Sequence, residues 1–187
     1  MTSPDGSLDD DLVTRRVLWS LTSGLYVLGT TGDVSNGPWN LMTINQVVQI
    51  SSTPRVVVLG VEEGSTTDAL LLTTGVAALS FLKREQRSLV RSFVKPVVDG
   101  AVLDTQGRLR ELGGHLVHLL SNGTPVLDDA PAWLALEVRE SQSFGSHRAF
   151  FAEVTGAGAD PALLAARPSE KTFELLRMED TRMNYGG

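Results

Sequence analysis

Two spacings of apolar residues recur along the chain, and they separate expected helices from expected strands. Near the N-terminus, apolar residues at helical spacing follow three aspartates and stop at Gly24, which predicts an amphipathic helix within residues 1–23. Runs rich in β-branched residues and ended by turn residues predict strands instead. The predicted strands span residues 25–30, 41–50, 56–61, 76–82, 132–139, 150–155 and 172–178.

Two further helices and one buried strand follow from the same pattern. A short helix is predicted to begin at Ser65 or Thr66 and to end at Gly75, and a second helix is predicted over residues 85–93. The run 56–61 is apolar at successive positions, which predicts a strand that is covered on both faces.

The number and spacing of these elements predict the fold class. Six or seven strands, mostly joined by short turns, with helices confined to a few connections, are typical of a mainly β fold, here an antiparallel β-barrel with peripheral helices. Residues 97–123 contain glycines that interrupt any period, so no element is predicted there. We expect one domain over residues 1–187, with the helix in 1–23 and a last strand and flexible tail in 172–187.

Composition and charge restrict the chemistry. The chain has no cysteine, which excludes disulfides, cysteine-ligated zinc, iron–sulfur clusters and thiol catalysis. It has no apolar run near the roughly 20 residues that span a bilayer and no export signal, so we expect a cytoplasmic protein with no membrane partner. Its net charge of −6 disfavours nucleic acid as a partner. No metal site is predicted, because no carboxylate pattern accompanies the histidines.

Two groups of residues are candidates for ligand binding. A basic series follows the strand 76–82 and comprises Lys83, Arg84, Arg87, Arg91 and Lys95. Four of these cations recur at every fourth position, so on a helix they form either an ordinary solvated face or one that meets a bound phosphate. His147 stands at a loop end ahead of the strand 150–155, where a side chain can reach a ligand.

The second group lies on the strand predicted at 41–50. Alternation places Thr43 and Asn45 on one face and Gln46 on the other. Because each buried amide needs hydrogen-bond partners, such a strand is poorly suited to the core. It is either an ordinary exposed strand or one that presents its polar groups to a flat, hydrogen-bonding heterocycle.

The ordered set of segments resembles a known family. Residues 40–57 resemble the signature of the flavin reductase-like proteins, which have a flavin-binding split barrel. Further matches follow in the same order, namely Thr67, Glu85-Gln86-Arg87, Arg91-Ser92-Phe93, residues 123–127 and Gly145-Ser146-His147 ahead of residues 150–154. The resemblance covers roughly residues 24–158.

This resemblance implies an antiparallel split β-barrel of the FMN-binding type. It implies a homodimer that binds FMN, or FAD in some relatives, in a groove between subunits, with NADH or NADPH as hydride donor. The implied enzyme is an NAD(P)H-dependent flavin reductase, whose reduced flavin passes to free flavin, a partner monooxygenase or a small acceptor. The alternatives are a flavin-storing or flavin-sensing module without turnover and a split-barrel oxidase acting on another small substrate.

The resemblance also assigns residues to parts of the cofactor. The isoalloxazine and ribityl region is expected to contact Asn40, Met42, Thr43, Ile44, Asn45 and Gln46. The phosphate is expected at a helix N-terminus with Ser65, Thr66 and Thr67, and additional positive charge is expected from Arg87, Arg91 or Lys95. His147 would border the face where nicotinamide or substrate stacks.

The chain departs from the family pattern at two places. Asn45-Gln46 stands where many relatives have Ser-Trp, so one aromatic wall of the flavin pocket is missing. Glu63-Gly64 stands before the helix where relatives often carry a basic residue.

Overall fold

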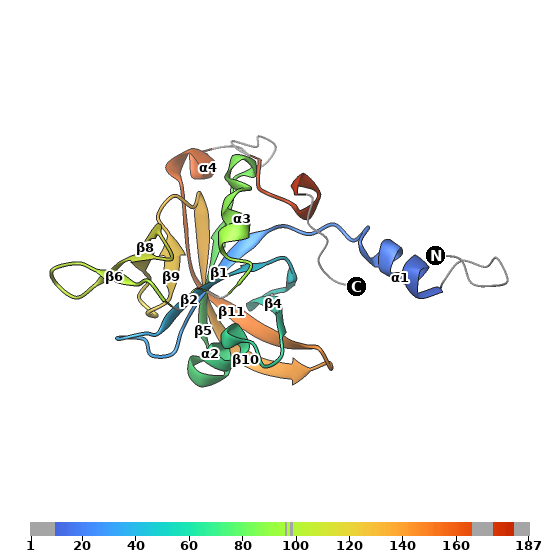
Figure 1. The fold of residues 1–187 in the computed structure, drawn as a ribbon, viewed down its shortest axis with the longest axis horizontal. Helices are drawn as coiled ribbons and strands as arrows, with labels where there is room; N and C mark the ends of the chain where they lie inside the picture. The colour runs from blue at the N-terminus through green and yellow to red at the C-terminus, as the bar shows by residue number, and fades with distance from the viewer. Residues whose placement is uncertain (1–9, 96, 98, 166–173, 182–187) are drawn as a thin grey trace.

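Antiparallel sheets hold most of the regular secondary structure in the computed structural model, which describes residues 10–95, 97, 99–165 and 174–181 (Figure 1). The mainly β fold predicted from the sequence is therefore confirmed. In chain order the elements are α1 (Asp10–Leu18), β1 (Tyr26–Thr31), β2 (Trp39–Ile44), β3 (Val47–Ser52), β4 (Arg55–Glu62), α2 (Thr66–Thr74), β5 (Val76–Phe81), η1 (Arg84–Gln86), α3 (Leu89–Ser92), β6 (Val102–Leu103), β7 (Leu109–Leu112), β8 (His115–Leu119), β9 (Pro125–Leu127), β10 (Ala132–Ser143), β11 (His147–Ala159), α4 (Pro161–Ala165) and η2 (Met178–Asp180).

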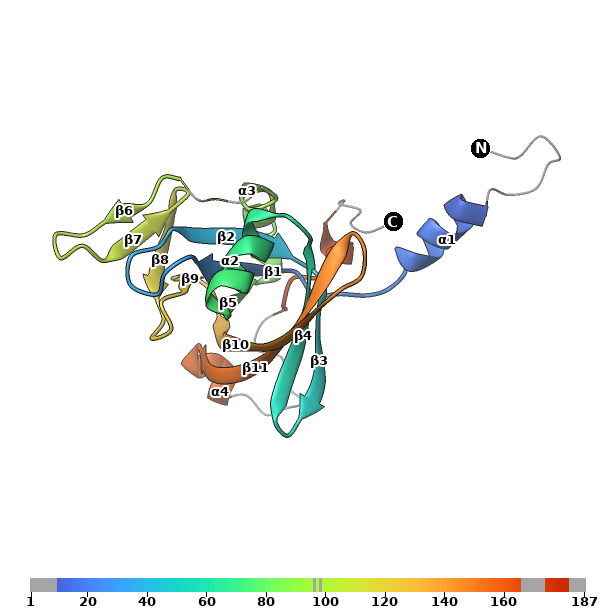
Figure 2. The same ribbon diagram turned by 90° about the horizontal axis from the view of Figure 1, so that it is seen from below.

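The larger sheet has seven strands in the order β2-β1-β5-β10-β11-β4-β3. β2 and β3 are consecutive in the chain yet occupy opposite edges of this sheet. Two residues, Asn45 and Gln46, connect them, so the Cα atoms of Ile44 and Val47 lie at most about 11 Å apart. The sheet must therefore curl until its edges approach, and Figure 2 shows β3 starting where β2 ends. The described strands β2 and β3 do not pair with each other, so the barrel is split at this corner.

Two clusters of buried side chains form the core. One lies inside the curled sheet and includes Leu59, Leu79 and Phe150, and α2 contributes Leu71 to it while packing against β1, β2 and β4. The other cluster joins the barrel to the second sheet, whose order is β6-β7-β8-β9, because β9 packs against β1 and β5.

The second sheet comes from a region in which no element was predicted. Glycines at tight turns separate its short strands, for example Gly113 and Gly114 between β7 and β8, both with positive φ. These glycines interrupt the apolar period without ending the sheet. Leu112 and Val117 are nevertheless fully buried in the core cluster, which explains why the strands form.

Several predicted boundaries are corrected by the structure. The single strand predicted at 41–50 is two strands, β2 and β3, because the chain turns at Asn45-Gln46. The helix predicted at 85–93 is divided into η1 and α3, so no continuous helix carries the basic stripe. The helix α2 is confirmed, with Ser65 as its N-cap and Gly75 as a left-handed C-cap.

The two ends of the chain also bear on the predicted boundaries. The helix predicted within 1–23 is confirmed as α1, and Figure 2 shows it extending away from the sheets. Part of the predicted last strand, residues 172 and 173, lies outside the described residues, as does the tail from residue 182. The described part of that segment forms isolated bridges at Leu175 and Arg177 followed by η2. None of the described helices is long and apolar enough to cross a membrane.

The strand β4 is covered on one face rather than on both. Val57, Leu59 and Val61 are buried, whereas Val56 and Val58 are only half-buried. The apolar run predicted that other parts of the protein pack on the second face of β4 as well. Among the described residues of one chain, no segment buries that face.

A close approach between the two sheets at Gly29 generates a stability prediction. Gly29 on β1 faces β9 so closely that a Cβ there would collide with the carbonyl oxygen of Pro125. We expect Gly29→Ala to lower the free energy of unfolding by about 2–3 kcal/mol, because both backbones must shift. The matched control is Gly156→Ala on β11, whose Cβ would meet Ala135 Cβ at an ordinary 3.5 Å. Urea unfolding checks both variants, and equal losses would contradict this packing.

Candidate functional site

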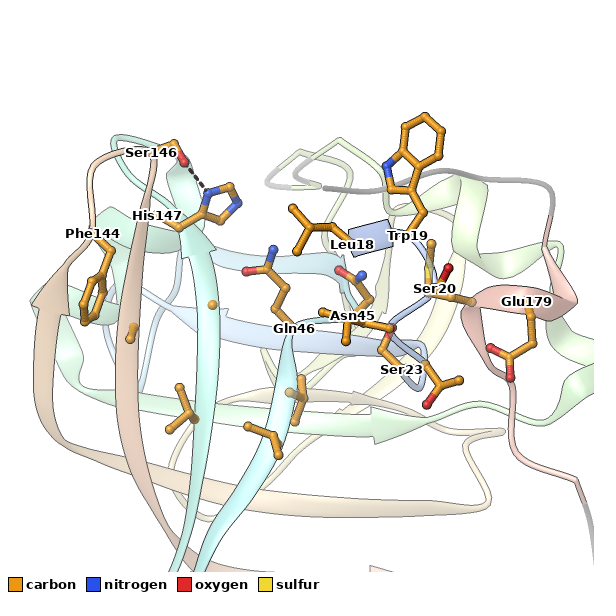
Figure 3. A pocket seen from close by; sticks show the side chains of 18 of the residues that line it. Leu18, Trp19, Ser20, Ser23, Asn45, Gln46, Phe144, Ser146, His147 and Glu179 are labelled. Carbon is orange, nitrogen blue, oxygen red and sulfur yellow. Dashed lines mark hydrogen bonds between the residues drawn. The ribbon is translucent and has the colours of Figure 1, made fainter. Parts of the chain in front are cut away.

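A pocket of about 1000 Å³ opens at the split in the barrel (Figure 3). Four parts of the chain surround it, namely the segment before β1, the β2–β3 corner with the adjoining part of β4, the tip of the β10–β11 hairpin, and η2 with Thr181. Its lining residues are Leu18, Trp19, Ser20, Leu21, Thr22, Ser23, Asn45, Gln46, Val47, Val48, Val58, Gly60, Phe144, Ser146, His147, Arg148, Ala149, Met178, Glu179 and Thr181.

The β2–β3 corner places two side-chain amides at this pocket. The backbone is held by two hydrogen bonds, in which Val47 N donates to Asn45 O at 2.9 Å and Gly60 N donates to Gln46 O at 2.8 Å. The Gln46 side chain lies across Gly60, where a Cβ would collide with it. The glycine in β4 therefore makes room for the amide of Gln46.

The tip of the β10–β11 hairpin forms the opposite side of the pocket. Ser146 Oγ lies 3.0 Å from His147 Nδ1, a hydrogen-bonding distance, and Phe144 N donates to His147 O at 2.8 Å. Figure 3 shows His147 and Gln46 on two sides of the same opening. The predicted residues Asn45, Gln46 and His147, far apart in sequence, are thus brought together.

The C-terminal described segment reaches the pocket because it is fastened to the barrel. Leu176 N donates to Leu82 O at 2.8 Å, and Leu25 N donates to Leu176 O at 3.0 Å. Arg84 contacts Glu174 at 2.6 Å and Asp180 at 2.7 Å. The hydrogen bond to Glu174 and the charge of Asp180 raise the pKa of Arg84, and the two ion pairs attach this segment to Arg84.

Other predicted cofactor residues lie in the interior. Asn40 and Thr67 are fully buried, and Asn40 Nδ2 donates to Thr67 Oγ1 at 2.9 Å and to Thr30 Oγ1 at 3.2 Å. Asn40 Oδ1 accepts the N–H of Val97 at 3.0 Å, and Thr67 Oγ1 donates to the sulfur of Met42. These polar groups are used between β1, β2, α2 and residue 97, and they do not line the pocket.

Thr43 and Ile44 support the corner from the other side. Ile44 is buried in the core inside the curled sheet. Thr43 N donates to Phe93 O at 2.8 Å, and Thr43 Oγ1 donates to Val90 O at 2.9 Å. Thr43 therefore attaches α3 to the outer edge of β2, two residues before Asn45.

The predicted phosphate ligands lie away from the pocket lining. Ser65 caps α2 by accepting the N–H of Asp68 at 3.2 Å, and Thr66 is exposed. Arg87, Arg91 and Lys95 are exposed around α3. The structure does not gather these two groups at the pocket.

Sequence reasoning missed several lining residues. Trp19 and Phe144 give the pocket aromatic surface, and Arg148 follows His147 directly. Phe144 offered a signal, since it is a large apolar residue within a polar stretch, and it is 64% exposed. Trp19 gave none, because it reads as part of the N-terminal helix pattern.

The chemistry of the lining suits a flat, partly polar ligand. Val48 and Val58 provide apolar surface, while the amides of Asn45 and Gln46 can donate and accept hydrogen bonds at one edge. An isoalloxazine ring has this combination of apolar faces and polar edges. The described residues at the pocket therefore fit the ring portion of a flavin.

The chain resembles proteins of one family in both sequence and structure. Residues 18–174 match the family described as "Flavin reductase like domain". None of the curated proteins compared matches the chain.

Solved structures with the same fold cover most of the chain at low identity. The styrene monooxygenase flavin reductase SMOB from Pseudomonas putida S12 has a TM-score of 0.62 at 24% identity, covering 79% of this chain and 86% of its own. The NADH:FAD oxidoreductase SgcE6 from Streptomyces globisporus C-1027 has a TM-score of 0.65 at 23% identity, covering 87% and 88%. An FMN-binding protein from Thermus thermophilus has a TM-score of 0.62 at 20% identity, covering 79% and 77%. At these identities the likeness establishes the fold.

The positions of the two asparagines generate a second prediction. Asn40→Ala removes the three buried hydrogen bonds that the Asn40 amide makes with Thr30, Thr67 and Val97, so we expect it to lower the free energy of unfolding by about 2–3 kcal/mol. Asn45→Ala removes an amide at the pocket, and we expect a loss of about 0.5 kcal/mol or less. Urea unfolding of both variants is the measurement. A stable Asn40→Ala variant would mean that its side chain is not part of the core network.

Proposed function

The chain belongs to the flavin reductase-like family, and on that premise we propose that it reduces a flavin held in the pocket at the β2–β3 corner. Membership in this family supports a flavin-dependent oxidoreductase with NADH or NADPH as hydride donor. The observation that carries the location is the meeting of Asn45, Gln46 and His147 around one pocket of about 1000 Å³. A pocket of this volume is large enough for a ligand the size of a flavin.

In this proposal the protein supplies binding and orientation. When bound, the flavin supplies the redox chemistry by accepting hydride from the nicotinamide. The amides of Asn45 and Gln46 hydrogen-bond the polar edge of the ring, and Val48 and Val58 pack against its apolar surface. His147, oriented by Ser146, borders the face on which the nicotinamide stacks. Trp19 and Phe144 provide the aromatic surface that Gln46 does not.

We propose that a second copy of the chain completes this site. The outer face of β3 and β4 exposes Val48 and Ile50, at 58% and 53%, and Val48 pairs with half-buried Val58, which pairs in turn with Phe151 on β11. This is the face of β4 whose cover was predicted but is not supplied within one chain. A homodimer that covers it would place the pocket, which includes Val48 and Val58, in a groove between subunits.

The phosphate end of the flavin is proposed to lie toward α3. Arg87, Arg91 and Lys95 are exposed there, and Thr43 attaches α3 to the strand that leads to the corner. FMN is the first ligand to test and FAD the second.

We further propose a cytoplasmic location, where nicotinamide donors are regenerated. We also propose a monooxygenase as one acceptor of the reduced flavin, since the similar protein SMOB is described as the flavin reductase of a styrene monooxygenase.

The second candidate function is a flavin-binding module without turnover. The observation in its favour is Gln46, which stands where many relatives have an aromatic residue. The two functions differ in one visible result. Anaerobic NADH or NADPH bleaches the bound flavin of a reductase and leaves the colour of a storage or sensing module unchanged.

His147 generates a kinetic prediction. His147→Ala removes a side chain proposed to border the nicotinamide, so we expect KM for the nicotinamide donor to rise about tenfold with little change in flavin affinity. The matched control is His118→Ala, which removes an exposed histidine that pairs with Asp128 away from the pocket. Steady-state kinetics and flavin titration check both variants. Equal changes in both would place the nicotinamide elsewhere.

The proposed dimer is tested by charge on its apolar face. Val48→Asp places a carboxylate in the proposed contact, so we expect it to convert the dimer to a monomer. Leu72→Asp is the control, because Leu72 is equally apolar and 55% exposed but lies on α2. Sedimentation analysis of the wild type and both variants measures the oligomeric state. A wild type that is monomeric with flavin bound would contradict the shared groove.

A further inference from the structure

The N-terminal end of α2 is already occupied by side chains of the protein. Ser65 Oγ accepts the N–H of Asp68 at 3.2 Å, and Asp68 Oδ2 accepts the N–H of Gly64 at 3.0 Å. Asp68 is 4% exposed, and its carboxylate is held at this end of the helix, where it accepts the N–H of Gly64 just ahead of the Ser65 cap. This is the position where the family resemblance places the flavin phosphate.

The same carboxylate holds the β10–β11 hairpin. Arg148 Nε donates to Asp68 Oδ1 at 2.9 Å, and Arg148 Nη2 lies 3.7 Å from Glu63 Oε2. The Arg148 side chain is 21% exposed and that of Asp68 is 6% exposed, so the pair is largely shielded from water. Removing either partner leaves the other charge poorly solvated.

A second contact fastens the hairpin on the other side of His147. Glu63 N donates to Ser146 O at 3.0 Å, immediately ahead of α2. Ser146 and Arg148 flank His147 in the chain, and both are attached to the entrance of α2. The backbone of His147 is therefore fixed from both sides by contacts that do not involve its own ring.

Charge at this end of α2 opposes a phosphate. Among the described residues, Glu62, Glu63 and Asp68 bring carboxylates to this end of the helix, and the guanidinium of Arg148 pairs with Glu63 and Asp68. A phosphate bound here would face like charges at short range and would have to displace Asp68 from its bonds. Thr67 offers no substitute, because its hydroxyl is fully buried and bonded to Asn40 and Met42.

We propose that Glu63 and Asp68, at the N-terminal end of α2, hold the tip of the β10–β11 hairpin through Ser146 and Arg148. We call this set of contacts the latch. In this proposal the N-terminal end of α2 is not a subsite for the flavin phosphate. Asp68 and Arg148 are positioning residues, which act on the nicotinamide side of the pocket by holding His147 in place. The consequence for the reaction rests on the proposed function, whereas the latch itself is a property of the protein without ligand.

The first test separates the latch from a phosphate site by ligand pairs. FMN and riboflavin differ by the phosphate, and flavin fluorescence titration gives both dissociation constants for wild type, Asp68→Asn and Arg148→Met. The latch predicts that the ratio of the two constants stays within about twofold of wild type in each variant. A phosphate at α2 predicts instead that Arg148→Met weakens FMN about tenfold or more relative to riboflavin and that Asp68→Asn strengthens it, and this result would overturn the proposal.

The second test needs no flavin. We expect Asp68→Asn and Arg148→Met each to lower Tm by about 5 °C or more, and the double variant to fall no further than the worse single variant. Arg139→Met is the matched control, because Arg139 also forms two ion pairs near this hairpin but is 47% exposed, and we expect its Tm to stay within about 2 °C of wild type. Additive losses at Asp68 and Arg148 would refute the latch.

The third test measures whether the latch affects the reaction. We expect Arg148→Met to raise KM for the nicotinamide donor about fivefold or more, and Arg148→Lys, which keeps the positive charge, to restore part of the loss. An unchanged KM in a variant with lowered Tm would refute the positioning role. If no flavin binds to the wild type, the proposed function fails, while the Tm measurements still decide on the latch.

Discussion

The two-residue connection between β2 and β3 is the constraint on which the rest of the structure depends. These strands stand at opposite edges of a seven-stranded sheet, so a connection of Asn45 and Gln46 can exist only if the sheet curls until its edges meet. The curl encloses the core around Leu59, Leu79 and Phe150. The described edge strands β2 and β3 do not pair with each other, which leaves a split at the corner.

The split accounts for the location and the composition of the pocket. Asn45 and Gln46 lie between the two strands and outside their backbone pairing. Their amides therefore reach the pocket together, whereas in a regular strand they would point to opposite faces. The hairpin tip with His147 and the fastened C-terminal segment then surround the corner. In the proposed function, the corner amides bind a flavin at its polar edge and one face of the ring stays open to the nicotinamide.

Much of the fold could be predicted from the sequence, and the failures have physical causes. The cap at Ser65 and the stop at Gly75 are local signals, so α2 was predicted correctly. The break at Asn45-Gln46 was missed because neither residue is a glycine or proline, and the turn is imposed by closure of the sheet. The second sheet was missed because its strands are short and its glycines interrupt every period.

The candidate site was predictable to a smaller extent. His147 and Gln46 were predicted as ligand-binding residues, and they share a pocket. Asn40 belongs to the same motif, yet its amide is used inside the core, which only three-dimensional contacts reveal. Asp68 and Arg148 are 80 positions apart in the sequence, so no local sequence pattern predicts that they pair.

Hydrogen–deuterium exchange of the full chain, with and without bound FMN, tests the location of the flavin most directly. If the flavin binds at the split in the barrel, protection increases at residues 18–23, 45–48 and 144–149, which line the pocket from three parts of the chain. Protection confined to other segments, with these three unchanged, would contradict the account.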